Sequence, residues 1–214
     1  MSEPLGIEFE PSTPRIYRTC TLIQPQDEIG TLTFESQWGR VDQNIFLATL
    51  ESSSYHDTKV FVKFISGSYS QDVHEHLAAH GLAPKLYSSA RVDGAPTAYI
   101  MEYLDPSTWQ ALHRYLESDA GADIVLSQLR KALENIITVL ELKKYVHGDL
   151  RANIMIRKDS PRDAPDLRIV DFDMVGVANQ VCYIVNVNEE IKWPGKAGGL
   201  IQVGHDWEMV SSWL

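Results

Sequence analysis

Three polar side chains, His147, Asp149 and Asn153, gather in one short stretch between a long helical pattern and an apolar run. A second apolar run, about twenty residues later, ends in two acids, Asp171 and Asp173. A carboxylate on a loop can orient a hydroxyl nucleophile, while an amide oxygen and a second carboxylate can hold magnesium. Phosphoryl transfer from ATP requires this combination of groups.

Periodic patterns indicate the elements that must position these side chains. Between residues 123 and 145, apolar residues recur on one helix face, which predicts a long amphipathic helix ending just before the polar stretch. The apolar runs Ile154–Ile156 and Leu167–Val170 predict two strands, and the polar segment 158–165 predicts an exposed turn between them. A final helix is expected over His205–Leu214.

The first hundred residues favour strands, with one short helix that starts at Gln71 and closes at Gly81. Residues 1–28 contain four prolines among polar residues, and we interpret them as an extended arm with a strand around Ile16–Leu22. A break after Leu104 precedes a helix that Ser107 or Thr108 could cap and that runs to about Leu116. The other predicted strands are Gly30–Phe34, Ile45–Leu50, Val60–Ile65 and a hairpin of Lys85–Arg91 with Thr97–Tyr103 around Asp93 and Gly94.

Length, composition and charge narrow the class of protein. A chain of 214 residues with 44% hydrophobic and 22% charged residues can bury a core and is ordinary for a globular protein. No apolar run approaches the span of a bilayer, and the acidic N-terminus lacks an apolar signal core, so neither membrane insertion nor secretion is expected. The net charge of −10 argues against nucleic acid as a partner. Cys20 and Cys182 favour free buried thiols in a reducing compartment over a disulfide.

Two features of the first half concern charged or metal-binding side chains. Lys63 stands in the middle of an apolar strand and needs a partner if it is buried. On the helix that follows, His76 and His80 share a face that His74 does not closely join, which favours a solvated helix face over a zinc site.

In this order, the features resemble the catalytic core of the protein-kinase-like superfamily. His147-Gly-Asp149 is the most specific motif, and its histidine–glycine–aspartate form also occurs in small-molecule phosphotransferases that share the fold. The resemblance implies that Lys63 anchors ATP and that Glu75 pairs with Lys63. It implies that Asp149 is the catalytic base and that Arg151 steadies the transferred phosphate. It also implies that two further residues hold magnesium, Asn153 and Asp171.

Two more segments support the resemblance. Tyr99–Leu104 is similar to the hinge between the lobes of that superfamily, which implies that Met101 is the gatekeeper and that the backbone of Glu102 to Leu104 binds adenine. Asp206 resembles a buried aspartate of the family whose carboxylate accepts hydrogen bonds from the backbone around His147.

The sequence also departs from the family pattern. Three residues, rather than four, separate Asp149 from Asn153. Asp173 replaces a glycine, and Gly148 replaces an arginine that reads activation-loop phosphorylation in many protein kinases. Between Phe34 and Ile45 there is a single glycine, Gly39, where the family's phosphate-covering loop has three.

The segments Gly81–Tyr87, His147–Arg151 and His205–Asp206 are similar to a group of short kinase-like proteins of mushroom-forming fungi. The resemblance covers residues 30–214. It implies an α+β fold, namely a compact two-lobed protein-kinase-like fold truncated after the sixth large helix of the larger lobe. We expect a sheet lobe over residues 1–103, including the arm 1–28, and a mostly helical lobe over residues 104–214.

The resemblance implies an ATP-dependent phosphotransferase that is serine/threonine-protein kinase-like. It would use ATP and Mg²⁺, act on a protein substrate and reside in the cytoplasm. Two alternatives remain open. The departures from the family pattern motivate a non-catalytic, pseudokinase-type binding module, and Gly148 together with the lack of further docking helices motivates a small-molecule kinase.

Overall fold

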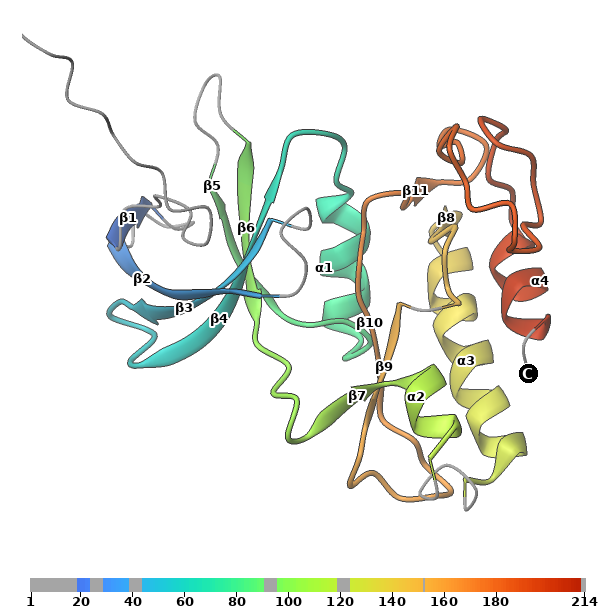
Figure 1. Ribbon diagram of the computed structural model, residues 1–214, viewed down its shortest axis with the longest axis horizontal. Coiled ribbons are helices and arrows are strands. Elements are labelled where there is room, and N and C mark those ends of the chain that lie inside the picture. The colour runs from blue at the N-terminus through green and yellow to red at the C-terminus, as the bar shows by residue number, and fades with distance from the viewer. Residues whose placement is uncertain are drawn as a thin grey trace, which may run out of the picture.

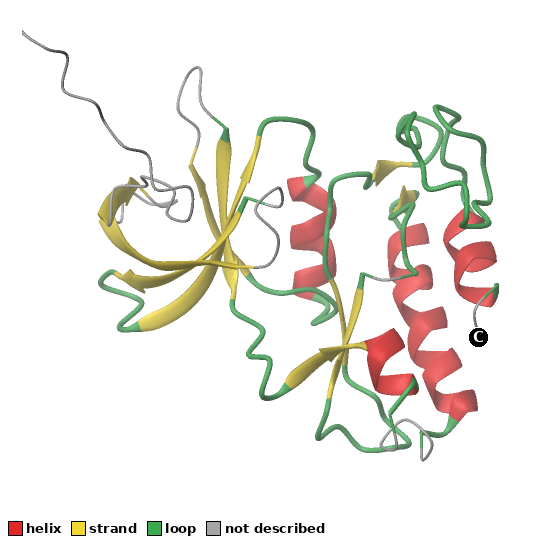
Figure 2. Cartoon of the chain, viewed as in Figure 1, coloured by secondary structure: helices red, strands yellow, loops and turns green. Residues whose placement is uncertain are grey.

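The computed structural model describes residues 19–23, 29–38, 44–90, 96–118, 124–151 and 153–212. Figure 1 shows the larger sheet at one end of the molecule, helices α2, α3 and α4 at the other, and α1 between them. Figure 2 shows the same division by type of secondary structure. The predicted arm outside residues 19–23, Gly39 and the turn at Asp93 and Gly94 lie outside the described residues.

The larger sheet has six antiparallel strands in the order β1-β2-β3-β4-β6-β5. Side chains alternate along β4, so Val60 and Val62 are buried in the core of the sheet while Phe61 and Lys63 face a cavity on the other side. The strands of this sheet are β1 (Thr19–Ile23), β2 (Ile29–Trp38), β3 (Ile45–Glu51), β4 (Thr58–Ile65), β5 (Leu86–Ala90) and β6 (Thr97–Glu102).

The helices and short strands mostly follow the larger sheet along the chain. Helix α1 contacts both β5 and α3. The helices are α1 (Gln71–Ala79), α2 (Leu112–Leu116), α3 (Leu126–Glu141) and α4 (His205–Ser211). A three-stranded sheet, β10-β9-β7, and a pair, β11-β8, complete the fold. Their strands are β7 (Trp109–Ala111), β8 (Tyr145–Val146), β9 (Ile154–Arg157), β10 (Leu167–Ile169) and β11 (Gly176–Val177).

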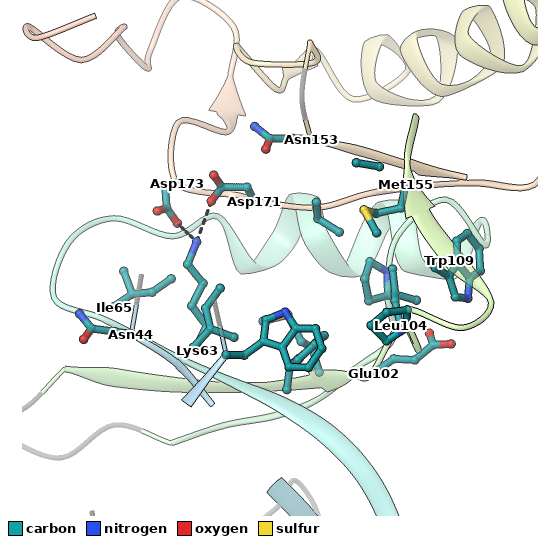
Figure 3. A pocket seen from close by; sticks show the side chains of 18 of the residues that line it. Asn44, Lys63, Ile65, Glu102, Leu104, Trp109, Asn153, Met155, Asp171 and Asp173 are labelled. Carbon is teal, nitrogen blue, oxygen red and sulfur yellow. Dashed lines mark hydrogen bonds and ion pairs between the residues drawn. The ribbon is translucent and has the colours of Figure 1, made fainter. Parts of the chain in front are cut away.

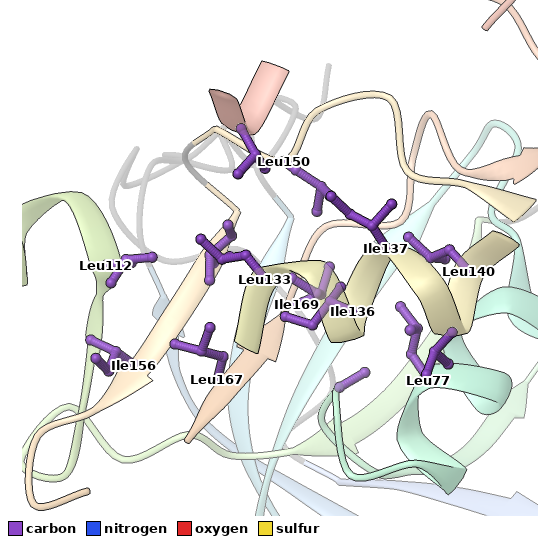
Figure 4. Packing of buried hydrophobic residues seen from close by; sticks show 14 of the residues in the cluster. Leu77, Leu112, Leu133, Ile136, Ile137, Leu140, Leu150, Ile156, Leu167 and Ile169 are labelled. Carbon is purple, nitrogen blue, oxygen red and sulfur yellow. The ribbon is translucent and has the colours of Figure 1, made fainter. Parts of the chain in front are cut away.

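The main core forms around α3, whose apolar face is buried as the helical spacing predicts (Figure 4). Leu77 of α1, Ile156 of β9 and Ile169 of β10 belong to the same buried core as this face. Each fully buried Leu or Ile side chain contributes about 1.5–3 kcal/mol. The helix therefore provides a rigid base for the polar loop that follows it. Its buried face consists of Leu129, Leu133, Ile136, Ile137, Val139 and Leu140.

Two predictions about the fold are wrong. The helix expected after a cap at Ser107 or Thr108 begins three or four residues late, because Trp109–Ala111 pairs with β9 as strand β7 before α2 starts. Pairing with a distant strand here overrides the local signal for a helix cap.

Cys182 is a free thiol, but it is exposed rather than buried. In the described part of the chain, no helix combines the length and apolar character that crossing a membrane requires.

Candidate functional site

The polar loop begins at a sharp turn that explains Gly148. Its φ angle is +80°, in the left-handed region that side chains other than glycine rarely adopt. A Cβ atom at this position would lie 2.6 Å from Cδ1 of Ile201, which is fully buried. The packing of Ile201 therefore favours glycine here, where the resemblance places an arginine.

Asp206 of α4 holds this turn, as the sequence predicts. Its carboxylate is buried, and it accepts hydrogen bonds from the backbone N–H of His147 at 2.7 Å and of Gly148 at 2.8 Å. Burial raises the pKa of Asp206 to about 6, and the two N–H donors oppose this shift. The catalytic geometry expected of the loop thus depends on a helix that lies almost sixty residues later in the chain.

His147 is buried as a neutral imidazole beneath the loop. Burial lowers its pKa to about 4. With Nε2 carrying the proton, Nε2–H donates to the carbonyl oxygen of Val170 at 3.2 Å, and Nδ1 accepts from the Asp149 N–H at 3.3 Å. The ring therefore joins the loop to the strand that leads into Asp171.

Asp149 and Arg151 form an ion pair within the loop. Nε of Arg151 lies 2.8 Å from Oδ1 of Asp149, although without hydrogen-bond alignment, and Nη2 donates to Oδ2 at 3.2 Å. Burial and the nearby Asp171 raise the pKa of Asp149, while the guanidinium lowers it. The guanidinium also lies 5.1 Å from the ring centre of Trp193, within the range of a cation–π interaction. Arg151 is therefore held from two sides.

Despite the loop being one residue short, Asn153 and Asp171 line the same cavity. The Asn153 side-chain amide donates to the backbone oxygen of Asp149 at 3.0 Å, and its own backbone oxygen accepts from the Val170 N–H at 2.9 Å. Asp171 has a φ of +67°, a conformation that is uncommon for a residue other than glycine. These contacts fix an amide and a carboxylate on one wall of the cavity.

Lys63 reaches this wall from β4, and Figure 3 shows its amine between Asp171 and Asp173. Nζ lies 2.6 Å from Oδ1 of Asp171 and 2.9 Å from Oδ1 of Asp173. Burial lowers the pKa of the amine, but the two carboxylates outweigh burial and raise it overall. The predicted pairing of Lys63 with Glu75 is wrong, since the Glu75 carboxylate accepts a hydrogen bond from the Gln71 amide at 2.8 Å.

Helix α1 turns His74, rather than Glu75, toward the interior. His74 is fully buried and stacks on Phe172 with ring centres 4.2 Å apart, so the expected solvated face is wrong for this histidine. His76 also has a partner, because its Nε2 lies 2.9 Å from the carbonyl oxygen of Val139. Within the residues that the structure describes, no group of three or more His, Cys, Asp or Glu side chains could hold a metal ion.

A cavity of about 1090 Å³ extends from the Lys63 amine to the segment that follows β6. Met101, Glu102 and Leu104, which belong to the predicted hinge, line its far wall, and Met155 of β9 lines it as well. The described residues include no hydrogen-bond partner for the Leu104 N–H. The side chain of Glu102 contacts the neighbouring backbone, because its Oε2 accepts a hydrogen bond from the Lys85 N–H at 2.9 Å.

Aromatic residues that were not predicted as site residues also line this cavity. Trp38 and Phe61 both line it, with ring centres 5.3 Å apart, and Tyr103 packs against Phe61 at 4.9 Å. Trp38 ends β2 next to the glycine-poor segment, and the β4 alternation that exposes Lys63 also exposes Phe61. That alternation was the one available signal, and it applied to Phe61 alone.

The donors present fit a magnesium–nucleotide complex. Mg²⁺ is commonly bound by one or two carboxylates together with phosphate oxygens, and Asp171 and Asn153 supply oxygen ligands beside the Lys63 cation. The apolar side chains toward Leu104 suit a flat ring, and the volume slightly exceeds that of typical small-molecule sites. Asp149 does not line this cavity. Its backbone oxygen accepts a hydrogen bond from the side-chain amide of Asn153, which does line it.

Among solved structures, the chain is similar to the kinase PK-1 of Cydia pomonella granulovirus. The TM-score is 0.60 at 15% sequence identity, and the match covers 84% of this chain and 67% of that chain. No family model matches the sequence, and no curated protein matches it. The chain therefore has a kinase-like fold, as the order of its motifs predicts.

Proposed function

We propose that this protein is an ATP-dependent phosphotransferase that acts on a hydroxyl group of a protein substrate, as a serine/threonine kinase does. One observation carries the proposal: Lys63, Asn153 and Asp171, from three separate segments of the chain, line one cavity that Met101, Glu102 and Leu104 also line. A cation, an amide oxygen and a carboxylate are the groups that bind a nucleoside triphosphate and its metal ion. The kinase-like fold supports the same function.

Each residue would have a defined task. Bound Mg–ATP supplies the phosphoryl group. Lys63 would bind phosphate oxygens, and Asn153 and Asp171 would hold the metal ion. Asp149 would orient the acceptor hydroxyl and take up its proton, while Arg151 would move from Asp149 to neutralise charge on the transferred group. In this scheme Arg151 has to leave the Asp149 carboxylate, from which its Nε lies 2.8 Å away in this structure.

The first prediction is that the native chain binds Mg–ATP and that Lys63→Met does not. At a ligand concentration about 100 times Kd, binding adds about 2.7 kcal/mol to stability. A thermal unfolding series with ATP and magnesium should therefore raise the Tm of the native chain and leave that of Lys63→Met unchanged.

Lys59→Met is the matched control, because Lys59 lies on the same strand and pairs with Glu35 in an exposed position. This variant should respond to Mg–ATP as the native chain does. The proposal fails if millimolar nucleotide with magnesium produces no shift in the native chain.

The ion pair within the loop favours a second candidate, a non-catalytic binding module. Arg151 approaches both oxygens of Asp149, which leaves the base engaged in this structure. If the pair is permanent, the protein would bind nucleotide and recognise a partner without transferring phosphate. Mg–ATP binding by the native chain, without transfer from labelled ATP to generic protein or to itself, would support this candidate.

A further inference from the structure

The amine of Lys63 is held by two carboxylates from one short segment, Asp171 and Asp173 (Figure 3). The side chain of Lys63 is only 13% exposed, so its charge requires a close partner. Phe172, between the two acids, is buried against His74, which leaves both carboxylates on the cavity wall. Asp173 therefore stands beside Lys63 because the ring of Phe172 is anchored in the core.

Helix α1 offers Lys63 no acidic partner. Its buried polar side chain is His74, and both ring nitrogens are engaged: Nε2 lies 2.7 Å from the carbonyl oxygen of Pro84 and Nδ1 lies 2.5 Å from the Tyr69 hydroxyl. Glu75 is hydrogen-bonded to Gln71 on its own helix. Among the described residues, the carboxylates in ion-pair contact with Lys63 are those of Asp171 and Asp173 alone.

The two carboxylates differ in the tasks that the proposed function gives them. Asp171 would hold a metal ion, whose positive charge would compete with Lys63 for this carboxylate. Asp173 is free of that task and can remain paired with the amine. A partly buried lysine that keeps one carboxylate partner while a metal ion is bound would stay where it can contact the phosphates.

We propose that Asp173 is a positioning residue that holds the Lys63 amine at the cavity, in the role that the sequence assigned to Glu75. This proposal rests on the proposed function. It assigns a task to the residue that replaces the family's glycine at position 173. In this chain the anchor for the lysine comes from the segment after β10, and α1 contributes the neutral His74 instead.

A double-mutant cycle on the full-length chain, without nucleotide, tests the pairing. Lys63→Met, Asp173→Asn and their combination are compared by thermal unfolding. We expect the Tm of the double variant to differ from the sum of the two single changes, because the residues are in contact. The matched cycle of Lys63→Met with Glu75→Gln should be additive. Additive changes in the first cycle would overturn the proposal.

Steady-state transfer from Mg–ATP tests the positioning role. Asp173→Asn should lower kcat by about tenfold, the equivalent of one charge-assisted hydrogen bond, while KM for ATP changes by less than about threefold. Asp173→Glu should recover most of the lost kcat, because it restores a carboxylate that can reach the amine. Glu75→Gln should behave as the native chain does. A native kcat in Asp173→Asn would sink the positioning role.

Failure of the proposed function looks different. In that case Mg–ATP does not raise the Tm of the native chain, and the double-mutant cycle alone decides whether Asp173 anchors Lys63. Non-additivity between positions 63 and 173 would then retain Asp173 as the anchor of Lys63, and additivity would remove it.

Discussion

An Asp149→Asn variant is expected to lose phosphoryl transfer by a factor of about 10²–10⁴, the range that a positioned general base contributes. An asparagine keeps the size of the side chain and can accept a hydrogen bond from Arg151, but it cannot take up the proton of the acceptor hydroxyl. Because Asp149 lies outside the cavity lining, Mg–ATP should still raise the Tm of the variant. The measurement is incorporation of labelled phosphate from ATP into protein.

Asp159→Asn is the matched control, since Asp159 is an exposed acid paired with Arg157. It should transfer phosphate at the native rate. Equal incorporation by the native chain and Asp149→Asn would remove Asp149 from the mechanism. Loss of both transfer and Mg–ATP binding in Asp149→Asn would show that the change damaged the cavity rather than the base.

The largest expected effect on stability comes from Asp206→Ala. Asp206 accepts two backbone hydrogen bonds in a site where it is almost fully buried. Its removal leaves the N–H groups of His147 and Gly148 without an acceptor, at a cost of about 2–3 kcal/mol. Urea unfolding at neutral pH should show this loss, and Glu208→Ala, an exposed acid on the same helix, should leave stability within about 0.5 kcal/mol.

The effect of Asp206→Ala should also depend on pH. Burial raises the pKa of Asp206 from its ordinary 3.8 to about 6, so the folded state holds the proton more tightly than the unfolded state. The contribution of Asp206 to stability is therefore greatest below pH 3.8, and it falls as the pH rises to about 6. The difference in unfolding free energy between the native chain and Asp206→Ala should grow from about pH 7 to about pH 4.5. A difference that shrank toward acid would contradict the raised pKa.

Patterns within single elements were predictable from the sequence. The buried face of α3 follows from helical spacing, and the position of Lys63 on the cavity side of β4 follows from alternation along a strand. The place of Asp206 followed from a motif, and its hydrogen bonds to the His147 turn confirm the prediction. In each case a local pattern and the tertiary structure agree, as expected for a sequence that specifies one fold.

Contacts between distant elements were not predictable in the same way. Glu75 and His74 are adjacent, but neighbouring side chains on a helix point about 100° apart. An error of one residue therefore placed Glu75, rather than His74, toward the interior. Strand β7 exists because Trp109–Ala111 meets β9, which no local pattern shows. At Asp171–Asp173 no local pattern indicated that Lys63 would lie between the two carboxylates.

The two hydrogen bonds between Asp206 of α4 and the turn at His147 also affect how the protein unfolds locally. Helix α4 has only seven residues, and the carboxylate of Asp206 is the acceptor for the amides of His147 and Gly148. Any excursion that detaches α4 therefore exposes those two amides at the same moment, and all of them would exchange with deuterium as one cooperative unit. Val210 of α4 is buried in the core around α3, so the same excursion would also open that core.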